Sequence, residues 1–197
     1  MHTEKEVVGL LRSTEAILDG HFLLSSGKHA GRYIQCAKLL QHPEPAQVVC
    51  AMLAERALPL GKIDLVVGPA LGGIVIAYEL ARALNVRGIF TEREAGEMTL
   101  RRGFRIEPGE KVLVAEDVVT TGRSALEAAQ VVRKSGGEVV GVACIVDRRM
   151  HREEVISLPV ISAVRLEIAI YDPKDCPLCR RGDPCIKPGS RTETDPP

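Results

Sequence analysis

The segment that most constrains this chain runs from Lys111 to Ala129 and reads KVLVAEDVVTTGRSALEAA. Residues 112–115 form an apolar run short enough for a strand buried on both faces, and Glu116 and Asp117 follow it directly. After two β-branched residues and a polar loop, apolar residues recur at helical spacing. This order predicts a strand, a polar loop and a helix, the repeating unit of an α/β fold with a parallel sheet.

The polar loop, Thr120 to Ser124, places hydroxyl groups and a glycine where the helix begins. Free backbone N–H groups and the positive end of a helix dipole together bind phosphate monoesters. Glu116 and Asp117, just upstream, are suited to accept hydrogen bonds from sugar hydroxyls. Caps and turns use the same residue types, so these residues alone leave a purely structural role open.

Composition narrows the classes of function. The chain has 197 residues, of which 45% are apolar, and this fits one domain with a buried core. A formal net charge of zero and 3% aromatic residues argue against nucleic acid as the main partner. No apolar run has the length of a membrane span, and MHTEKEVVGLL lacks the features of a signal peptide, so we expect a cytoplasmic protein without a membrane partner.

The rest of the chain predicts more units of the same kind. We expect a single domain over residues 1–197: an α/β core at about 41–172 with a mostly parallel sheet flanked by helices, and a small hood built from 1–40 and 173–197. Strands are expected at 22–24, 33–36, 63–67, up to 90, 112–115, 139–146 and 159–170, and helices from a capping box at Thr3 and Glu6 to Gly20, at 43–58, from about Ile74 and from about Ala125.

The motif EDVVTTGRS resembles the phosphoribosyl pyrophosphate (PRPP) signature of the type I phosphoribosyltransferases, in which an apolar strand, two acids and a T-x-G-x-S/T loop occur in this order. The resemblance implies that the acids hold the ribose hydroxyls and that the loop holds the 5′-phosphate. The residues so assigned to PRPP are Glu116, Asp117, Val118, Val119, Thr120, Thr121, Gly122, Arg123 and Ser124.

Two further segments resemble orotate phosphoribosyltransferases. HFLLSSGKHAGRYIQC is similar to their N-terminal segment, which implies that Tyr33 and Ile34 lie against the base and that Ser25 or Lys28 lies near PRPP. Arg148 follows a strand, where an arginine can hold a carboxylate through two hydrogen bonds; a surface charge at the strand end is the alternative. In the family an arginine here holds orotate, so the predicted orotate residues are Thr120, Arg148, Tyr33 and Ile34.

An arginine-rich segment, RGIFTEREAGEMTLRRGFRIEPGEK, precedes the PRPP motif. It has two interpretations: a solvated hairpin with self-pairing charges, or a mobile loop that closes over the pyrophosphate. Orotate enzymes often carry a catalytic lysine in such a loop, but this chain has none between Val86 and Glu110. In the second interpretation Arg93, Arg101 and Arg102 supply the catalytic charge.

The C-terminal tail contains Cys176-Pro-Leu-Cys179 and then Cys185. A C-x-x-C pair is half of a zinc site or a redox pair, but only three thiols cluster in the sequence, and His151 is the one further ligand considered. A structural knuckle or a disulfide is therefore the preferred interpretation. No residue is assigned as a metal ligand.

The resemblance as a whole implies an enzyme that converts orotate and PRPP to orotidine 5′-monophosphate and pyrophosphate in pyrimidine (UMP) biosynthesis. It also implies Mg²⁺ as cofactor and a homodimer in which the mobile loop of one subunit reaches the active site of the other. The alternatives are the same chemistry on a purine or another base, and a PRPP-binding regulator without turnover.

Overall fold

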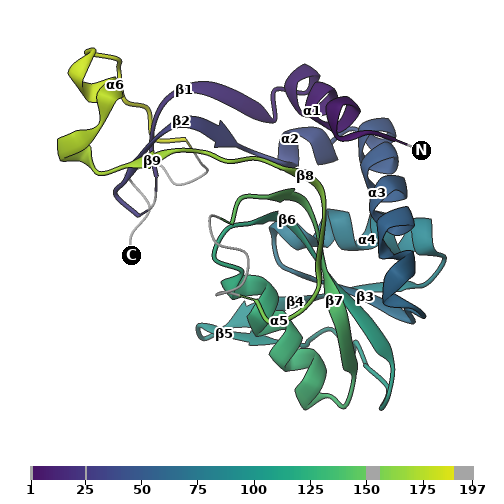
Figure 1. Ribbon diagram of the computed structural model, residues 1–197. Helices are drawn as coiled ribbons and strands as arrows, with labels where there is room; N and C mark the ends of the chain where they lie inside the picture. The colour runs from purple at the N-terminus through teal and green to yellow at the C-terminus, as the bar shows by residue number, and fades with distance from the viewer. Residues whose placement is uncertain (1, 25, 150–155, 189–197) are drawn as a thin grey trace.

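The computed structural model describes residues 2–24, 26–149 and 156–188 (Figure 1). The main sheet of this part of the chain has the strand order β5-β4-β3-β6-β7-β8. Strand β5 runs antiparallel to β4, whereas the other neighbouring pairs are parallel, as the sequence predicts. The strands are β3 (Leu65–Pro69), β4 (Arg87–Glu94), β5 (Glu97–Thr99), β6 (Lys111–Val119), β7 (Glu138–Asp147) and β8 (Val160–Arg165).

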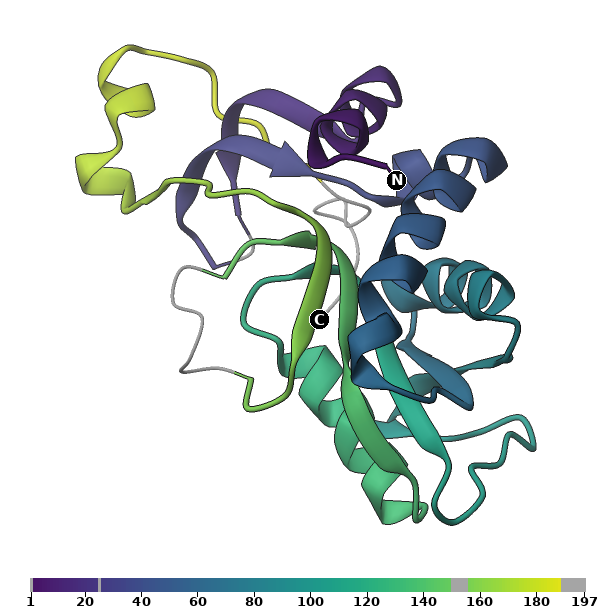
Figure 2. The same ribbon diagram turned by 45° about the vertical axis from the view of Figure 1, so that its right-hand side comes forward.

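Helices cover both faces of this sheet (Figure 1 and Figure 2). On one face lie α3 (Pro43–Ala57) and α4 (Gly72–Leu84), and on the other lies α5 (Arg123–Lys134). Alternate residues of β6 serve the two faces, because Leu113 and Ala115 join the core with α3 and α4 while Val114 joins the core with α5. A strand buried in this way on both faces explains the continuous apolar run in the sequence.

A second, three-stranded antiparallel sheet forms the hood, which lies above the main sheet in Figure 1. It contains β1 (Ile17–Leu23), β2 (His29–Ile34) and β9 (Ile170–Tyr171) in the order β1-β2-β9. The tail continues through the short helices η2 (Pro173–Asp175) and α6 (Pro177–Arg180). It then returns to β1, where Leu23 N–H donates to the carbonyl of Ile186 (2.8 Å) and Ile186 N–H donates to that of His21 (2.9 Å).

The predicted first helix is shorter than expected. Helix α1 spans Glu4–Ser13, with Thr3 as N-cap accepting from Glu6 N–H (3.3 Å), so the predicted cap is confirmed. The helix does not extend to Gly20, because Glu15 adopts a left-handed φ of 54° and Ala16 N–H donates back to the carbonyl of Leu11 (2.7 Å), which ends the helical pattern. Strand β1 then begins at Ile17.

Two predicted strands are longer than expected. Strand β6 does not stop before the acids but continues to Val119, because it pairs with β7 as far as Asp147. Strand β4 continues past Phe90 to Glu94, because its end pairs with β5 in a hairpin. The remaining elements are α2 (Ala37–Leu40) and η1 (Leu58–Leu60). Within the described ranges, no helix is both long and apolar enough to cross a membrane.

Candidate active site at the strand ends

Glu116 and Asp117 lie in the last part of β6, next to the β7 strand. Burial raises the pKa of Glu116 to about 8, and the neighbouring charge of Asp117 adds to this effect. Burial also raises the pKa of Asp117, although Val118 N–H donates to its Oδ1 (2.8 Å) and opposes the shift. Among the described residues no cation pairs with either carboxylate, so both are available to a hydroxyl-rich or cationic ligand.

The loop after β6 leads directly into α5. Gly122 is the N-cap of this helix and has a φ of 73°, a conformation that favours glycine. Gly122 has no side chain with which to cap the helix, and the first turn carries N–H groups that have no acceptor within the helix. Thr120 and Thr121 are exposed beside it, and Arg123 N–H donates weakly to Thr121 Oγ1 (3.4 Å). This end of α5 therefore offers backbone and hydroxyl donors to an anion.

Gly72, the first residue of α4, lies against the candidate site but is not among the predicted site residues. A Cβ atom at this position would lie 2.8 Å from Asp117 Oδ1, closer than real Cβ atoms approach. An alanine here would therefore displace the carboxylate of Asp117, whereas glycine lets α4 begin against it. The signal in the sequence is the pair of glycines in GPALGG, because adjacent glycines permit a close backbone approach.

Arg148 and Arg149 follow β7 but have different surroundings. Arg149 pairs with Asp147 through two hydrogen bonds (3.0 and 2.9 Å), and both side chains are buried. Arg148 N–H donates to the carbonyl of Val119 (2.8 Å), which brings this residue beside the start of the loop. Its Nε is buried without a hydrogen-bond partner among the described residues, and burial lowers its pKa. Arg148 is thus the arginine available for a ligand.

The hood contributes Tyr33, which lies close enough to Arg148 to oppose the lowering of its pKa. The Tyr33 hydroxyl donates to Gln35 Oε1 (3.3 Å). Ile34 is 7% exposed and packs in the core, so its side chain does not face an open site. Ser25 lies outside the described residues, and Lys28 approaches Asp172 at 4.0 Å.

The arginine-rich segment forms the β4–β5 hairpin, with its charges paired. Arg93 lies in β4 rather than in a loop and pairs with Glu127 of α5. Arg101 lies 3.3 Å from Glu94, and Arg102 lies 3.0 Å from Glu92. The guanidinium of Arg102 also lies 5.6 Å from the centre of the Phe90 ring. The geometry is that of the self-pairing hairpin, and the catalytic role of these three arginines stays a prediction.

The tail cysteines lie beside two histidines that the sequence analysis did not connect with them. Cys176 and Cys179 approach His21 and His29 of the β1–β2 hairpin, and we call these four residues the His–Cys cluster. All six cysteines of the chain are free thiols in this structure, so the disulfide, one of the two preferred interpretations, is not formed. The considered ligand His151 lies outside the described residues.

Comparisons with known proteins match most of the chain. Residues 35–177 match the phosphoribosyl transferase domain family. The chain is 51% identical over 189 residues to the orotate phosphoribosyltransferase of Pelotomaculum thermopropionicum, which covers 96% of this chain and 98% of that relative.

Solved structures agree with this match. The orotate phosphoribosyltransferase of Aeropyrum pernix aligns with a TM-score of 0.68 at 28% identity, over 81% of this chain and 93% of that chain. The Mycobacterium tuberculosis H37Rv orotate phosphoribosyltransferase in complex with PRPP aligns with a TM-score of 0.67 at 28% identity, over 83% and 96% of the two chains. With its fold, its strand-end motif and nearly its whole length matched, this chain belongs to the phosphoribosyltransferase family, and within it to the orotate phosphoribosyltransferases.

Proposed function

We propose that this protein transfers the phosphoribosyl group of PRPP to orotate, giving orotidine 5′-monophosphate and pyrophosphate in pyrimidine (UMP) biosynthesis. The observation that carries the proposal is a group at the carboxyl end of the main sheet: two carboxylates without a cation partner among the described residues, the N-terminus of α5 and a partly buried arginine. We call this group the strand-end site: Glu116, Asp117, residues 120–124 and Arg148. Each part matches one chemical group of the two substrates.

PRPP presents ribose hydroxyls and phosphates to this site. The Glu116 and Asp117 carboxylates accept hydrogen bonds from the ribose hydroxyls, which replace the water that burial has removed from them. The loop 120–124 and the first turn of α5 donate to the 5′-phosphate through N–H and hydroxyl groups. The side chain of Val119 is fully buried, so this residue contributes through its backbone.

Orotate brings a carboxylate and a flat ring. Arg148 is suited to the carboxylate because its guanidinium is partly desolvated and its Nε has no partner among the described residues. Tyr33, close to Arg148, is suited to lie against the ring. Thr120 borders the same edge and is the further predicted orotate contact.

In the reaction the bond between ribose C1 and the pyrophosphate oxygen breaks, and its electron pair leaves with the pyrophosphate. The sugar becomes oxocarbenium-like, the type of charge also met in glycoside hydrolysis. The ring nitrogen of orotate forms the new bond from the opposite face. Glu116 and Asp117 favour this step because they hold the ribose in place, and because a cationic sugar beside them favours their ionised, negatively charged form.

The proposal includes Mg²⁺ as the cofactor, bound together with PRPP. The donor set fits, since two adjacent carboxylates without a cation partner among the described residues are hard oxygen ligands of the kind Mg²⁺ prefers. Glu116 and Asp117 are the residues that would hold it. When bound, the ion neutralises the charge that develops on the leaving pyrophosphate.

Arg93 in β4, and Arg101 and Arg102 just after β5, are proposed to bind the pyrophosphate. They would exchange their present partners Glu92, Glu94 and Glu127 for phosphate oxygens. These ion pairs lie at the surface and cost little to break. The hairpin is therefore able to change partners without unfolding the core.

A homodimer is the proposed assembly. Leu71, Val75 and Tyr78 lie along the start of α4 and are 84%, 47% and 69% exposed, which is unusual for large apolar side chains grouped on one helix. A second copy of the chain would cover them. We further propose a cytoplasmic location, which the six free cysteines support because reducing compartments keep thiols free.

The function is tested by incubating the purified protein with PRPP, Mg²⁺ and each of orotate, adenine, guanine and uracil, with release of pyrophosphate as the readout. We expect turnover with orotate alone. Turnover with a purine would replace the proposed substrate. PRPP binding by calorimetry without turnover on any base would instead favour a PRPP-sensing regulator.

The shared site of the dimer has a separate test. A variant with Arg93, Arg101 and Arg102 changed to Ala and an Asp117→Asn variant are mixed under conditions that exchange subunits. If the hairpin of one subunit serves the other, each mixed dimer contains one site without a lesion, and about a quarter of all sites regain activity at equal mixing. Demonstrated exchange without recovery would mean that the hairpin acts within its own chain or is not catalytic.

A further inference from the structure

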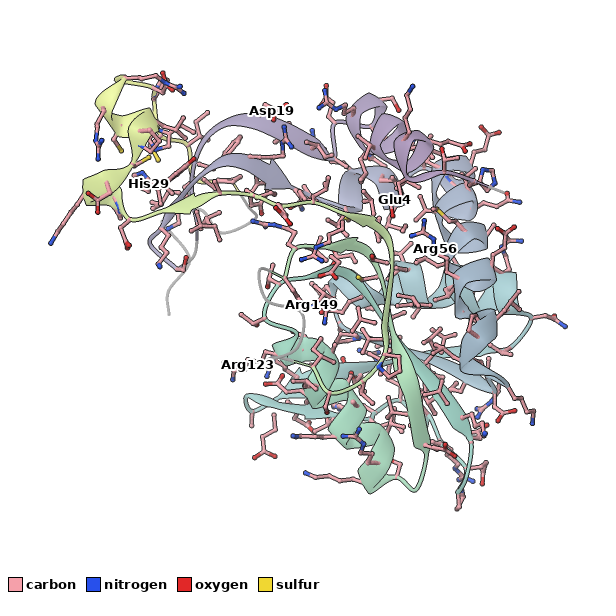
Figure 3. All side chains as sticks on the ribbon, in the orientation of Figure 1. Glu4, Asp19, His29, Arg56, Arg123 and Arg149 are labelled. Atoms are coloured by element: carbon pink, nitrogen blue, oxygen red, sulfur yellow. The ribbon has the colours of Figure 1, made fainter. Side chains whose placement is uncertain are left out.

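The His–Cys cluster lies at the outer end of the hood, away from the strand-end site. Figure 3 shows His29 next to α6, well separated from Arg149, which follows β7, and from Arg123, which begins α5. The four ligand atoms, one nitrogen from each histidine and the two sulfurs, all lie within 4.8 Å of one another. His21 is 3% exposed and Cys176 is 1% exposed, so part of this polar group is buried.

The spacing of these atoms approaches the edges of a tetrahedron. Cys176 Sγ and Cys179 Sγ lie 3.6 and 3.7 Å from His21 Nε2, and Cys179 Sγ lies 3.2 Å from His29 Nδ1. Ligand bonds of about 2.0–2.1 Å to nitrogen and 2.3 Å to sulfur give tetrahedral edges of roughly 3.3–3.8 Å. The two nitrogens are 2.8 Å apart, so a central ion needs only a small outward shift of one imidazole.

The second ring nitrogen of His21 is already held in the orientation that a metal ligand needs. His21 Nδ1 lies 2.8 Å from the carbonyl oxygen of Asp183, to which it donates as N–H. This bond fixes the tautomer and leaves the Nε2 lone pair directed at the cluster. Histidines that ligate metals characteristically have such a bond from their other nitrogen.

We propose that His21, His29, Cys176 and Cys179 bind a structural Zn²⁺ ion that fastens the C-terminal tail to the N-terminal hairpin. Two thiolates and two neutral imidazoles in a tetrahedral arrangement are a typical structural zinc set. The two thiolates balance the charge of the ion. Four protein ligands leave no open position, so the site has no catalytic role.

The local fold explains why the tail needs such a bond. Helix α6 has four residues and η2 has three, too few to be stable through their own hydrogen bonds. The cluster joins His21 to Cys179 across 158 residues of sequence. Binding of zinc to ligands this far apart contributes its free energy directly to folding of the tail. Cys179 is exposed, which gives the ion a path from solvent.

Cys185 supplies a matched control. It is an exposed thiol on the same tail, but it is not one of the four residues whose ligand atoms converge. A site built from three thiols and one histidine would use Cys185, whereas the proposed site does not. A disulfide between Cys176 and Cys179 would use no metal at all.

The test measures zinc by inductively coupled plasma mass spectrometry in the full-length, tag-free protein and in the variants Cys179→Ser, His29→Gln and Cys185→Ser. We expect about one zinc ion per chain in the wild type and in Cys185→Ser, and a fall of at least about tenfold in Cys179→Ser and His29→Gln. Replacement with Co²⁺ should give the intense visible absorption of a tetrahedral thiolate site in the same two proteins that hold zinc.

Thermal unfolding provides a second readout that does not depend on the variants. Removal of the ion with a chelator should lower the unfolding temperature of the wild type, and Zn²⁺ but not Mg²⁺ should restore it. Wild-type protein without zinc that also fails to bind Co²⁺ would overturn the proposal. Zinc lost from Cys185→Ser but kept in His29→Gln would overturn the ligand set. An intact mass two hydrogens below that of the reduced chain, restored to the full value by a reductant, would instead show that Cys176 and Cys179 form a disulfide.

Discussion

The strand-end site and the His–Cys cluster are both polar, yet they are built for opposite purposes. The strand-end site gathers oxygen acceptors and unpaired donors, including a carboxyl whose pKa burial raises to about 8 and an arginine Nε without a partner among the described residues. The His–Cys cluster has its nitrogen and sulfur atoms already in contact with one another. The strand-end site is suited to substrates that bind and dissociate, whereas the polar atoms of the His–Cys cluster contact one another.

The two sites therefore affect the stability of the fold in opposite ways. Polar groups buried without partners destabilise the free protein, and a ligand that supplies those partners binds more strongly for that reason. A site with all its ligands at hand stabilises the fold instead. Variants of the first site should therefore change catalysis with little loss of stability, and variants of the second should do the reverse.

The largest effect expected is that of Asp117→Asn. It removes a charged acceptor for a ribose hydroxyl, worth roughly 1.5–3 kcal/mol, so kcat/KM for PRPP should fall about 10- to 150-fold. Steady-state kinetics measure the loss, and the unfolding temperature and zinc content should not fall. Near wild-type kinetics would remove Asp117 from the site and weaken the contrast between the two regions.

Replacement of Arg148 by Ala should act mainly on orotate. The loss of a bidentate partner for the carboxylate should raise KM for orotate roughly 10- to 100-fold and that for PRPP much less. Arg180→Ala, which removes an exposed arginine of α6, is the control and should leave both constants unchanged. Equal effects of Arg148→Ala on both substrates would refute carboxylate recognition.

Glu116→Gln should stabilise the free protein in a pH-dependent way. The folded-state pKa of about 8 lies above the ordinary value of 4.5, so the wild type loses stability as pH rises through this range. The variant should gain on the order of 2 kcal/mol at pH 9, less than the full shift implies because the group is not fully buried, and almost nothing at pH 4. Thermal unfolding across this range without substrate measures the gain, and a pH-independent difference would contradict it.

The smallest effect belongs to Gly72→Ala. The added methyl group would meet Asp117 Oδ1 at 2.8 Å and displace the carboxylate, so kcat/KM for PRPP should fall about tenfold. Gly9→Ala is the matched control, since a Cβ there meets nothing within 4 Å and the change should not lower activity. If Gly72→Ala were as active as this control, α4 would have no part in positioning the acid.

The strand-end site was predictable because most of it is contiguous in the sequence. Glu116 to Ser124 follow one another, and one strand, one loop and one helix bring them together. The alternation of apolar runs and helical spacing likewise predicted the mostly parallel sheet. The order of residues within one segment determines its local geometry, so a contiguous site of this kind can be predicted with little knowledge of the tertiary fold.

The features that the sequence did not predict depend on contacts between distant segments of the chain. Gly72 matters only because α4 begins against Asp117, and His21 meets Cys176 only because the tail returns to β1. The same reason explains the strand lengths, since β6 continues through its acids only where β7 is there to pair with it. The spacing of residues within a single segment does not show which distant segment will lie against it.

The return of the tail to β1 has a mechanical consequence. His29 and Tyr33 lie on the same strand, four positions apart, so roughly 13 Å of β2 separates them. A two-stranded ribbon held at one end swings freely, whereas one held at both ends does not. If the proposed zinc ion fastens the outer end of β2, it restricts the motion of Tyr33. If Tyr33 lies against orotate as proposed, part of the entropy cost of enclosing the ring is then already met in the free protein.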